Sequence, residues 1–173
     1  MRDDGLGSCF AEALSTLPLP NWVRAVDGGI GGLSLIDPME GAEVLVLVDA
    51  LSRDHGQPGE AKILVVNPSA VRPEEAVRML LEAGSHGVTP EILLAAASAL
   101  GVLPPRSYVA GVVPAEVDVG MGLSDAALEG CLRLMGLIND LLRSEGYGIL
   151  NVRDEDLTKA LKAVCPRDPP NII

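Results

Sequence analysis

The stretch Glu43-Val44-Leu45-Val46-Leu47-Val48-Asp49 decides the fold class, because its interior is apolar without a break. Such a run is typical of a strand that is buried on both faces, as in a parallel sheet covered by helices. Further strands are predicted at residues 22–26, 62–66 and 108–113. Helical patterns lie before, between and after these strands. They follow Gly5 as far as Leu17, then occur around 31–33, at 73–81, at 91–100 and from Ser124 to Leu142. This alternation predicts a doubly wound α/β fold with a mostly parallel sheet and helices on both faces.

Two helix starts are predicted in detail. Thr89 is a good N-cap and Pro90 a good first helical residue, and Ser124 is an N-cap followed by Asp125 in the first turn. The helix after Ser124 should bury one apolar stripe: Leu128, Cys131, Leu132, Met135, Ile138 and Leu142.

The chain is predicted to divide near residue 150. Residues 1–150 carry the alternating pattern and are expected to form the α/β domain. Residues 151–173 are charged and then rich in proline, so we expect an appended tail that is at most weakly helical.

Composition limits the possible partners. Hydrophobic residues make up 48% of the chain, aromatic residues 2%, and the formal net charge is −11. So few aromatic rings cannot build a stacking platform, and the negative charge opposes binding to phosphates, so nucleic acid is an unfavoured partner. No apolar run is long enough to span a membrane and the N-terminus is no secretory signal, so we expect a cytoplasmic protein.

The three cysteines, Cys9, Cys131 and Cys165, are odd in number and widely spaced. This pattern indicates neither a disulfide framework nor a CxxC metal site. We interpret those in apolar helical patterns as small core residues.

Three side chains that can bind a metal lie where a strand-like segment or turn leads into a helix: Asp4, Asp49 and His86. Consecutive members are separated by about the length of one strand-helix-strand unit, so one parallel sheet could gather all three at one rim. Two carboxylates and one imidazole leave open coordination positions, as a site that acts on a bound metal or a carbonyl requires. Each residue also has a simpler interpretation as a cap, a turn residue or a solvated side chain. His55, in a charged loop, is interpreted as solvated.

Several motifs occur in the order and spacing seen in the hydrogenase maturation endopeptidases, and this resemblance covers residues 3 to about 145. They are Asp3-Asp4-Gly5-Leu6-Gly7, Asp27-Gly28-Gly29-Ile30-Gly31, Leu45-Val46-Leu47-Val48-Asp49-Ala50, Ser85-His86-Gly87-Val88-Thr89-Pro90 and Met121-Gly122-Leu123-Ser124. The segment Gly28-Gly29-Ile30-Gly31-Gly32 does not match GxGxxG, so no dinucleotide or other resident organic cofactor is predicted.

The resemblance implies an endopeptidase that removes the C-terminal peptide of the nickel-iron hydrogenase large-subunit precursor after nickel has been inserted. It implies that Asp4, Asp49 and His86 are the catalytic residues and metal contacts. The segment Asp27-Gly28-Gly29 would lie beside them as a supporting group. In this family the protease is thought to hold no metal of its own, so the nickel would be carried by the cysteines of the substrate.

The sequence departs from the family pattern at two places. Val113 stands where many members have an acidic or amide residue, and the hydrophobic strand that normally precedes the acidic motif is absent before Asp3. We therefore expect Met1 to be an internal methionine of a longer chain, and the domain to lack its usual first strand.

Two other functions remain open: a different metallohydrolase with a resident metal, or an accessory module that binds a nickel-loaded partner without cutting it. All three predict that the side chains of Asp4, Asp49 and His86 converge to within roughly 5 Å of a shared point, because metal–ligand bonds are about 2 Å long.

Overall fold

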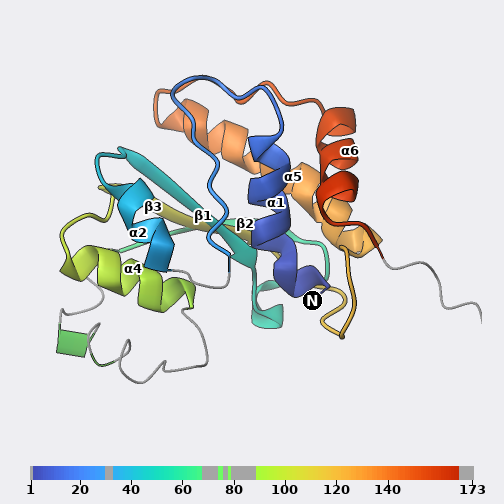
Figure 1. The fold of residues 1–173 in the computed structure, drawn as a ribbon, viewed down its shortest axis with the longest axis horizontal. Helices are drawn as coiled ribbons and strands as arrows, with labels where there is room; N and C mark the ends of the chain where they lie inside the picture. The colour runs from blue at the N-terminus through green and yellow to red at the C-terminus, as the bar shows by residue number, and fades with distance from the viewer. Residues whose placement is uncertain (1, 30–32, 68–73, 76–77, 79–88, 168–173) are drawn as a thin grey trace, which may run out of the picture. The chain divides into compact units, whose positions relative to one another are not determined.

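The computed structural model describes residues 2–29, 33–67, 74, 75, 78 and 89–167. Figure 1 shows the helices and strands of this part of the chain. In order they are a short 3-10 helix at Asp3–Gly5, α1 (Leu6–Ser15), a 3-10 turn at Leu33–Leu35, α2 (Ile36–Met39), β1 (Val44–Ala50), a 3-10 turn at Arg53–His55, β2 (Ala61–Val65), α4 (Pro90–Ala99), β3 (Arg106–Val112), α5 (Asp125–Ser144) and α6 (Asp154–Val164).

The three described strands form one sheet in the order β1-β3-β2. β1 and β3 run parallel, because contacts join their starts and their ends. Glu43, just before β1, pairs with Arg106, the first residue of β3, at 3.2 Å, and the Leu51 N–H, just after β1, donates to the carbonyl of Val112, the last residue of β3, at 2.9 Å. The predicted α/β fold is therefore confirmed, but β1, which we expected to be buried on both faces, is half-buried along its length, and β3 is the central strand of the described sheet.

β2 runs antiparallel to β3. The N–H of Val113 donates to the carbonyl of Glu60, and the N–H of Val66 donates to the carbonyl of Ser107, both at 2.9 Å, so the end of one strand meets the start of the other. The expectation of a mostly parallel sheet is wrong for this pair. An antiparallel edge strand on an otherwise parallel sheet is common in doubly wound folds, and apolar periodicity does not encode strand direction.

The chain divides into two compact units, and each strand passes from one into the other. The first unit comprises Met1–Ala25, Val48–Ile63 and Ala110–Ile173, and the second comprises Val26–Leu47 and Leu64–Val109. Residues 22–26 form no strand, contrary to the prediction, and Trp22 instead stacks on Tyr147 with ring centroids 5.5 Å apart. The absence of the usual first strand stays a prediction.

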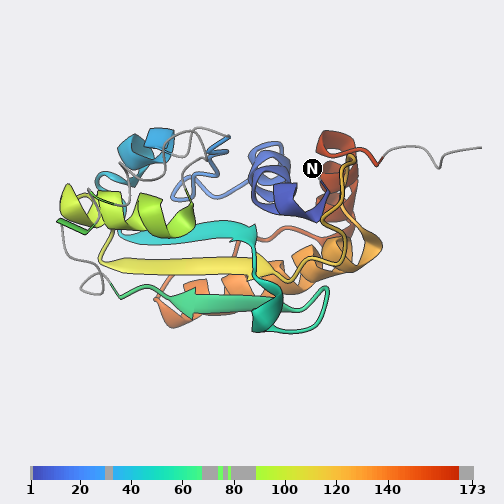
Figure 2. The ribbon, with the colours of Figure 1, turned by 90° about the horizontal axis from the view of Figure 1, so that it is seen from below.

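The first unit has its core between α1, α5 and α6. Figures 1 and 2 show α1 and α6 side by side. Their facing residues are fully buried, as are those of α5: Leu6, Phe10, Cys131, Leu134, Leu157 and Leu161. On α5 the predicted stripe is confirmed at Cys131, Met135, Ile138 and Leu142, and the Ser124 hydroxyl caps the helix by accepting from the Ala127 N–H at 3.1 Å.

The segment after residue 150 contains a helix close to residues 151–163, where we expected weak helicity within an appended tail. Its residues 154–164 form α6, which buries Leu157, Ala160 and Leu161 against the rest of the first unit. These apolar residues have helical spacing, and Lys159, which lies between them in the sequence, is exposed. Residues 168–173 lie outside the described part of the chain.

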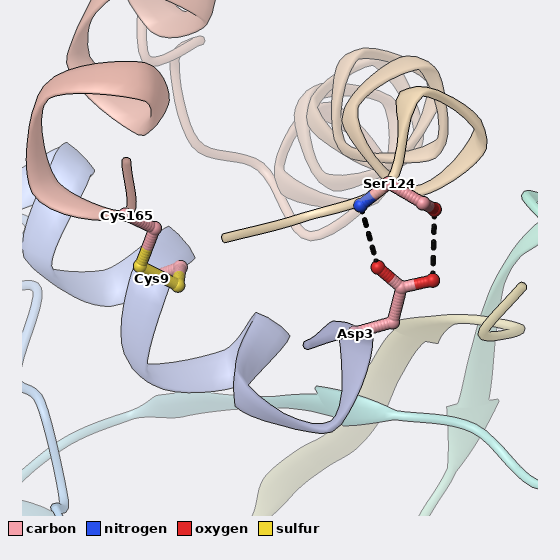
Figure 3. Close-up of a disulfide and its surroundings, with 4 residues drawn as sticks. All are labelled: Asp3, Cys9, Ser124 and Cys165. Carbon is pink, nitrogen blue, oxygen red and sulfur yellow. Dashed lines mark hydrogen bonds between the residues drawn. A yellow bond between two sulfur atoms is a disulfide. The ribbon is translucent and has the colours of Figure 1, made fainter. Parts of the chain in front are cut away.

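A disulfide joins Cys9 of α1 to Cys165, the residue that follows α6, with Cα atoms 5.9 Å apart (Figure 3). The expectation that the cysteines form no disulfide is therefore wrong for this pair, which is separated by 156 residues in the sequence. Cys131 is a buried free thiol, as predicted.

The second unit packs α4 and α2 together around Met39, Leu93 and Ala97. α4 begins as predicted: Pro90 is its first residue, and the Thr89 hydroxyl accepts from the Ile92 N–H at 3.4 Å. The helix predicted at 73–81 lies almost entirely outside the described residues. Within the described ranges, no helix combines the length and the apolar character needed to cross a membrane.

Candidate active site

The first turn of α1 lies directly against the end of β1. A Cβ atom added to Gly7 would come under 3.0 Å from the carbonyl oxygen of Val48 and 3.3 Å from the Cα of Asp49. Only glycine allows a helix to approach a neighbouring backbone this closely. Asp4 lies one turn before Gly7, so the segments that carry Asp4 and Asp49 are in backbone contact.

A second glycine, Gly111 of β3, contacts the same segment from the neighbouring strand. A Cβ atom at this position would come under 3.0 Å from the carbonyl oxygen of Asp49 and 3.1 Å from its carbonyl carbon. The backbone of Asp49 is thus packed between α1 and β3, with no side chain on either neighbouring glycine. This packing fixes the position of Asp49 within the first unit.

The two carboxylates have different surroundings. Asp49 is half-buried, and its Oδ1 accepts a hydrogen bond from the Ala50 N–H at 2.8 Å, which limits its rotation. Asp4 is exposed in the short 3-10 helix that precedes α1. Both carboxylates can offer oxygen atoms, one from a restrained side chain and one from a solvated side chain.

Asp3 precedes Asp4 in the sequence, and no role was predicted for it. Of these two adjacent aspartates, Asp3 is the buried one. Its exposed fraction is 0%, and its carboxylate accepts hydrogen bonds from the N–H groups of Ala115 and Glu116 at 2.8–2.9 Å. It also accepts from the N–H and the hydroxyl of Ser124 at 2.7 and 2.8 Å (Figure 3). The Asp3 N–H in turn donates to the Glu116 carbonyl at 3.0 Å. A buried carboxylate is stable only with such a set of donors.

The segment Asp27-Gly28-Gly29 belongs to the second unit. Asp27 is exposed, and its Oδ1 accepts from the Gly29 N–H at 3.0 Å, which forms a tight turn in which Gly29 has a φ of +51°. Such a φ favours glycine. The supporting role of this turn in the site stays a prediction.

His86 lies outside the described residues, so the convergence of Asp4, Asp49 and His86 stays a prediction. Among the side chains that the structure describes, no group of three histidine, cysteine or acidic residues could hold a metal ion. Two members of the expected set, Asp4 and Asp49, come from segments in contact. His55 is exposed in the 3-10 turn at Arg53–His55, in agreement with its interpretation as a solvated side chain.

Cys131 can be removed from the candidate nucleophiles. Burial, together with the nearby negative charge of Asp3, raises the pKa of the Cys131 thiol to about 12. The thiol is therefore protonated at neutral pH, and a protonated thiol is a poor nucleophile and a poor metal ligand.

A family model described as hydrogenase maturation protease matches residues 10–140, which is most of the chain. The chain belongs to the hydrogenase maturation protease family. This membership confirms the predicted function: a hydrogenase maturation endopeptidase, of the kind that processes the C-terminus of a hydrogenase large subunit. It also implies a hydrogenase large subunit as the substrate of this protease.

Relatives of this maturation protease carry names of the same kind. It is 28% identical over 126 residues to the hydrogenase 2 maturation protease of Escherichia coli (strain K12), in an alignment that covers 72% of this chain and 73% of that protein. It is 34% identical over 138 residues to the hydrogenase expression/formation protein HoxM of Azotobacter vinelandii, covering 76% of this chain and 63% of that protein. The chain thus spans less than two thirds of the length of HoxM.

Solved structures show the same fold. The hydrogenase maturating endopeptidase HybD from E. coli superposes with a TM-score of 0.62 at 22% identity, covering 84% of this chain and 87% of that chain. The hydrogenase 2 maturation peptidase from Thaumarchaeota archaeon SCGC_AB-539-E09 has a TM-score of 0.54 at 26% identity, covering 84% and 91%. At 22% identity, the likeness to HybD shows the fold alone.

Proposed function

We propose that this chain is a nickel-dependent endopeptidase of the aspartic type, and that it cuts the C-terminal peptide from a nickel-loaded hydrogenase large-subunit precursor. Asp4, Asp49 and His86 are its proposed catalytic residues and metal contacts. The nickel belongs to the substrate, and the side chains of the protease bind it at coordination positions that the substrate leaves open. Asp27, Gly28 and Gly29 are proposed to support the site as a turn beside it.

The chemistry of the donors is compatible with this function. Two carboxylates and one imidazole are ligands that suit nickel and also zinc, so selectivity must come from geometry and from delivery by the substrate. When the three side chains bind the nickel of the precursor, they hold the precursor in one orientation. One of these carboxylates, through the oxygen atom that does not contact the metal, would act as general base toward a water molecule at the scissile carbonyl.

The observation that carries the proposal is the close packing at Gly7 and Gly111. Both glycines lie at the backbone of residues 48–49, so the turn that bears Asp4 and the strand end that bears Asp49 belong to one tightly packed part of the first unit. Catalytic groups need positions that are fixed within a fraction of an ångström, and close-packed backbone supplies this better than long side chains do.

Asp49→Asn is expected to lower the rate of precursor cleavage by about 10³-fold, because it removes the negative charge but leaves the side-chain oxygen that accepts from the Ala50 N–H. The measurement is the loss of mass from the C-terminus of a nickel-loaded precursor, followed by mass spectrometry over time.

Asp140→Asn is the matched control. Asp140 is exposed on α5 and pairs with Arg143 at 3.0 Å, so its loss should leave the rate unchanged. If Asp49→Asn cut as fast as the wild-type chain, Asp49 would have no catalytic role. If the wild-type chain bound the precursor without any loss of mass, the accessory function would replace the endopeptidase.

A further inference from the structure

The hydrogen bonds of Asp3 join the two ends of one loop to the start of the chain. Ala115 and Glu116 lie at the beginning of the segment that leads from β3 to α5, and Ser124 lies at its end. The Asp3 carboxylate accepts from the N–H groups of Ala115 at 2.9 Å and Glu116 at 2.8 Å, and from the Ser124 N–H at 2.7 Å and its hydroxyl at 2.8 Å. One buried carboxylate therefore bonds to both ends of this loop.

Ser124 extends the connection into α5. Its hydroxyl donates to the Asp3 carboxylate (Figure 3). The same hydroxyl accepts from the Ala127 N–H at 3.1 Å, so it caps the helix while it binds the carboxylate. The N-terminus of a long helix carries partial positive charge, which stabilises a buried anion. Asp3 is thus bonded to a rigid element rather than to a flexible loop alone.

Asp4 is held between two anchored neighbours. Asp3 on one side and Leu6 on the other are both fully buried, and Gly7 is pressed against Val48. The exposed Asp4 side chain therefore projects from a backbone that cannot shift unless Asp3 or the first turn of α1 shifts with it. The N–H of Glu116 donates to the Asp3 carboxylate, and the Glu116 side chain also forms ion pairs with Arg2 and Arg167. These ion pairs further restrain the backbone on either side of Asp3.

We infer that Asp3 is a positioning residue for the cleavage reaction: its four accepted hydrogen bonds fix the turn that presents Asp4 to the nickel-loaded precursor. This inference rests on the proposed function of Asp4 and names a further residue that this function needs. Asp3 itself touches neither the metal nor the scissile bond, since its carboxylate is buried and fully engaged.

Asp3→Asn tests this inference, because the variant keeps the size of the side chain but turns one acceptor oxygen into an NH₂ group that faces N–H donors. The single-turnover cleavage rate should fall by about 100-fold, the loss expected when a catalytic group is displaced by about 1 Å. Ser124→Ala removes only the hydroxyl bond and should cause a smaller loss. Hydrogen exchange in the peptide covering residues 114–124 should be at least about tenfold faster in Asp3→Asn.

A double-mutant cycle separates positioning from loss of stability. In the Asp4→Ala background, Asp3→Asn should cause less than about a threefold further loss, because residues that act through one another have non-additive effects. All rates are compared below the melting temperature of the least stable variant, with Asp140→Asn as the control expected to match the wild-type chain.

The outcomes distinguish this inference from the proposed function. Full activity of Asp3→Asn, or an equal further loss in the presence and absence of Asp4, would overturn the positioning role while the endopeptidase function stands. A wild-type chain that cuts no precursor would overturn the proposed function and this inference with it. A loss of rate without faster exchange at residues 114–124 would show that Asp3 does not act through this loop.

Discussion

Reduction of the Cys9–Cys165 disulfide is expected to lower the free energy of unfolding by about 5 kcal/mol, because the bond closes most of the chain into one loop with a sequence separation of 156. For a chain of this length, such a change corresponds to a decrease in melting temperature of roughly 10–20 °C. The effect should centre on α6, since Cys165 directly follows this helix and Cys9 lies on α1, against which α6 packs. Thermal unfolding with and without a phosphine reductant measures it.

The variant Cys165→Ser provides the control. It should melt at the temperature of the reduced wild-type chain, and adding reductant should change it no further. Alkylation of the denatured, unreduced wild-type chain should label only Cys131, whereas reduction should make all three cysteines available. Equal melting temperatures of the oxidised and reduced wild-type chain would contradict a stabilising role for the bond, which persists only where thiols are oxidised.

Gly111→Ala is expected to destabilise the chain by about 3 kcal/mol or more and to impair cleavage at the same time. The added Cβ would come under 3.0 Å from the Asp49 carbonyl oxygen and 3.0 Å from the Leu51 Cγ. β3 is the central strand of the described sheet and is bonded on both sides, so it cannot move away to make room. The backbone that carries Asp49 must shift instead.

Gly136→Ala is the matched control for this substitution. Gly136 is exposed on α5, and an added Cβ there would meet no atom within 4 Å. Alanine should stabilise the helix at this position by about 1 kcal/mol, because glycine loses more conformational freedom on folding. Urea titrations give both free energies, and cleavage assays on the folded variants show whether the rate falls only for Gly111→Ala. A Gly111→Ala chain with wild-type stability and rate would show that the position of Asp49 is not tightly constrained.

Local signals in the sequence predicted much of this fold. The Thr89-Pro90 and Ser124-Asp125 pairs mark the starts of α4 and α5, because an N-cap hydroxyl and a following proline or carboxylate satisfy the first turn of a helix wherever the helix packs. The unbroken apolar run of β1 indicated a strand for an equally local reason, although this strand is half-buried rather than fully buried. These interactions depend on neighbours in the sequence, so they can be recognised without the tertiary structure.

Features that depend on distant partners could not be predicted in the same way. The direction of β2 is set by hydrogen bonds to β3, which periodicity does not reveal. Residues 22–26 have the composition of a strand, but a strand exists only where a partner accepts its hydrogen bonds. The pairing of Cys9 with Cys165 follows from the packing of α6 on α1. The sequence indicated weak helicity at residues 151–163, but it did not show that this segment packs on α1.

The candidate site shows the same limit. The sequence drew attention to Asp4, but it could not show that the adjacent Asp3 is the buried residue, since both have the same side chain and the difference depends on donors more than a hundred residues away. The sequence does contain one sign that a buried acceptor is needed. The loop before Ser124 is rich in glycine and ends in an N-cap serine, so it offers N–H groups that need an acceptor. The restraint of Asp49 by two glycines also depends on tertiary contact, although Gly7 and Gly111 were visible in the sequence.

The central claim is that this chain cuts a hydrogenase precursor through contact with nickel carried by that precursor. The most direct test mixes the purified chain with the same precursor in nickel-loaded and nickel-free forms and follows the intact mass of the precursor. We predict a C-terminal loss of mass from the nickel-loaded form alone, and none when Asp49→Asn replaces the wild-type chain. Equal cleavage of both forms, or cleavage of neither, would contradict the claim.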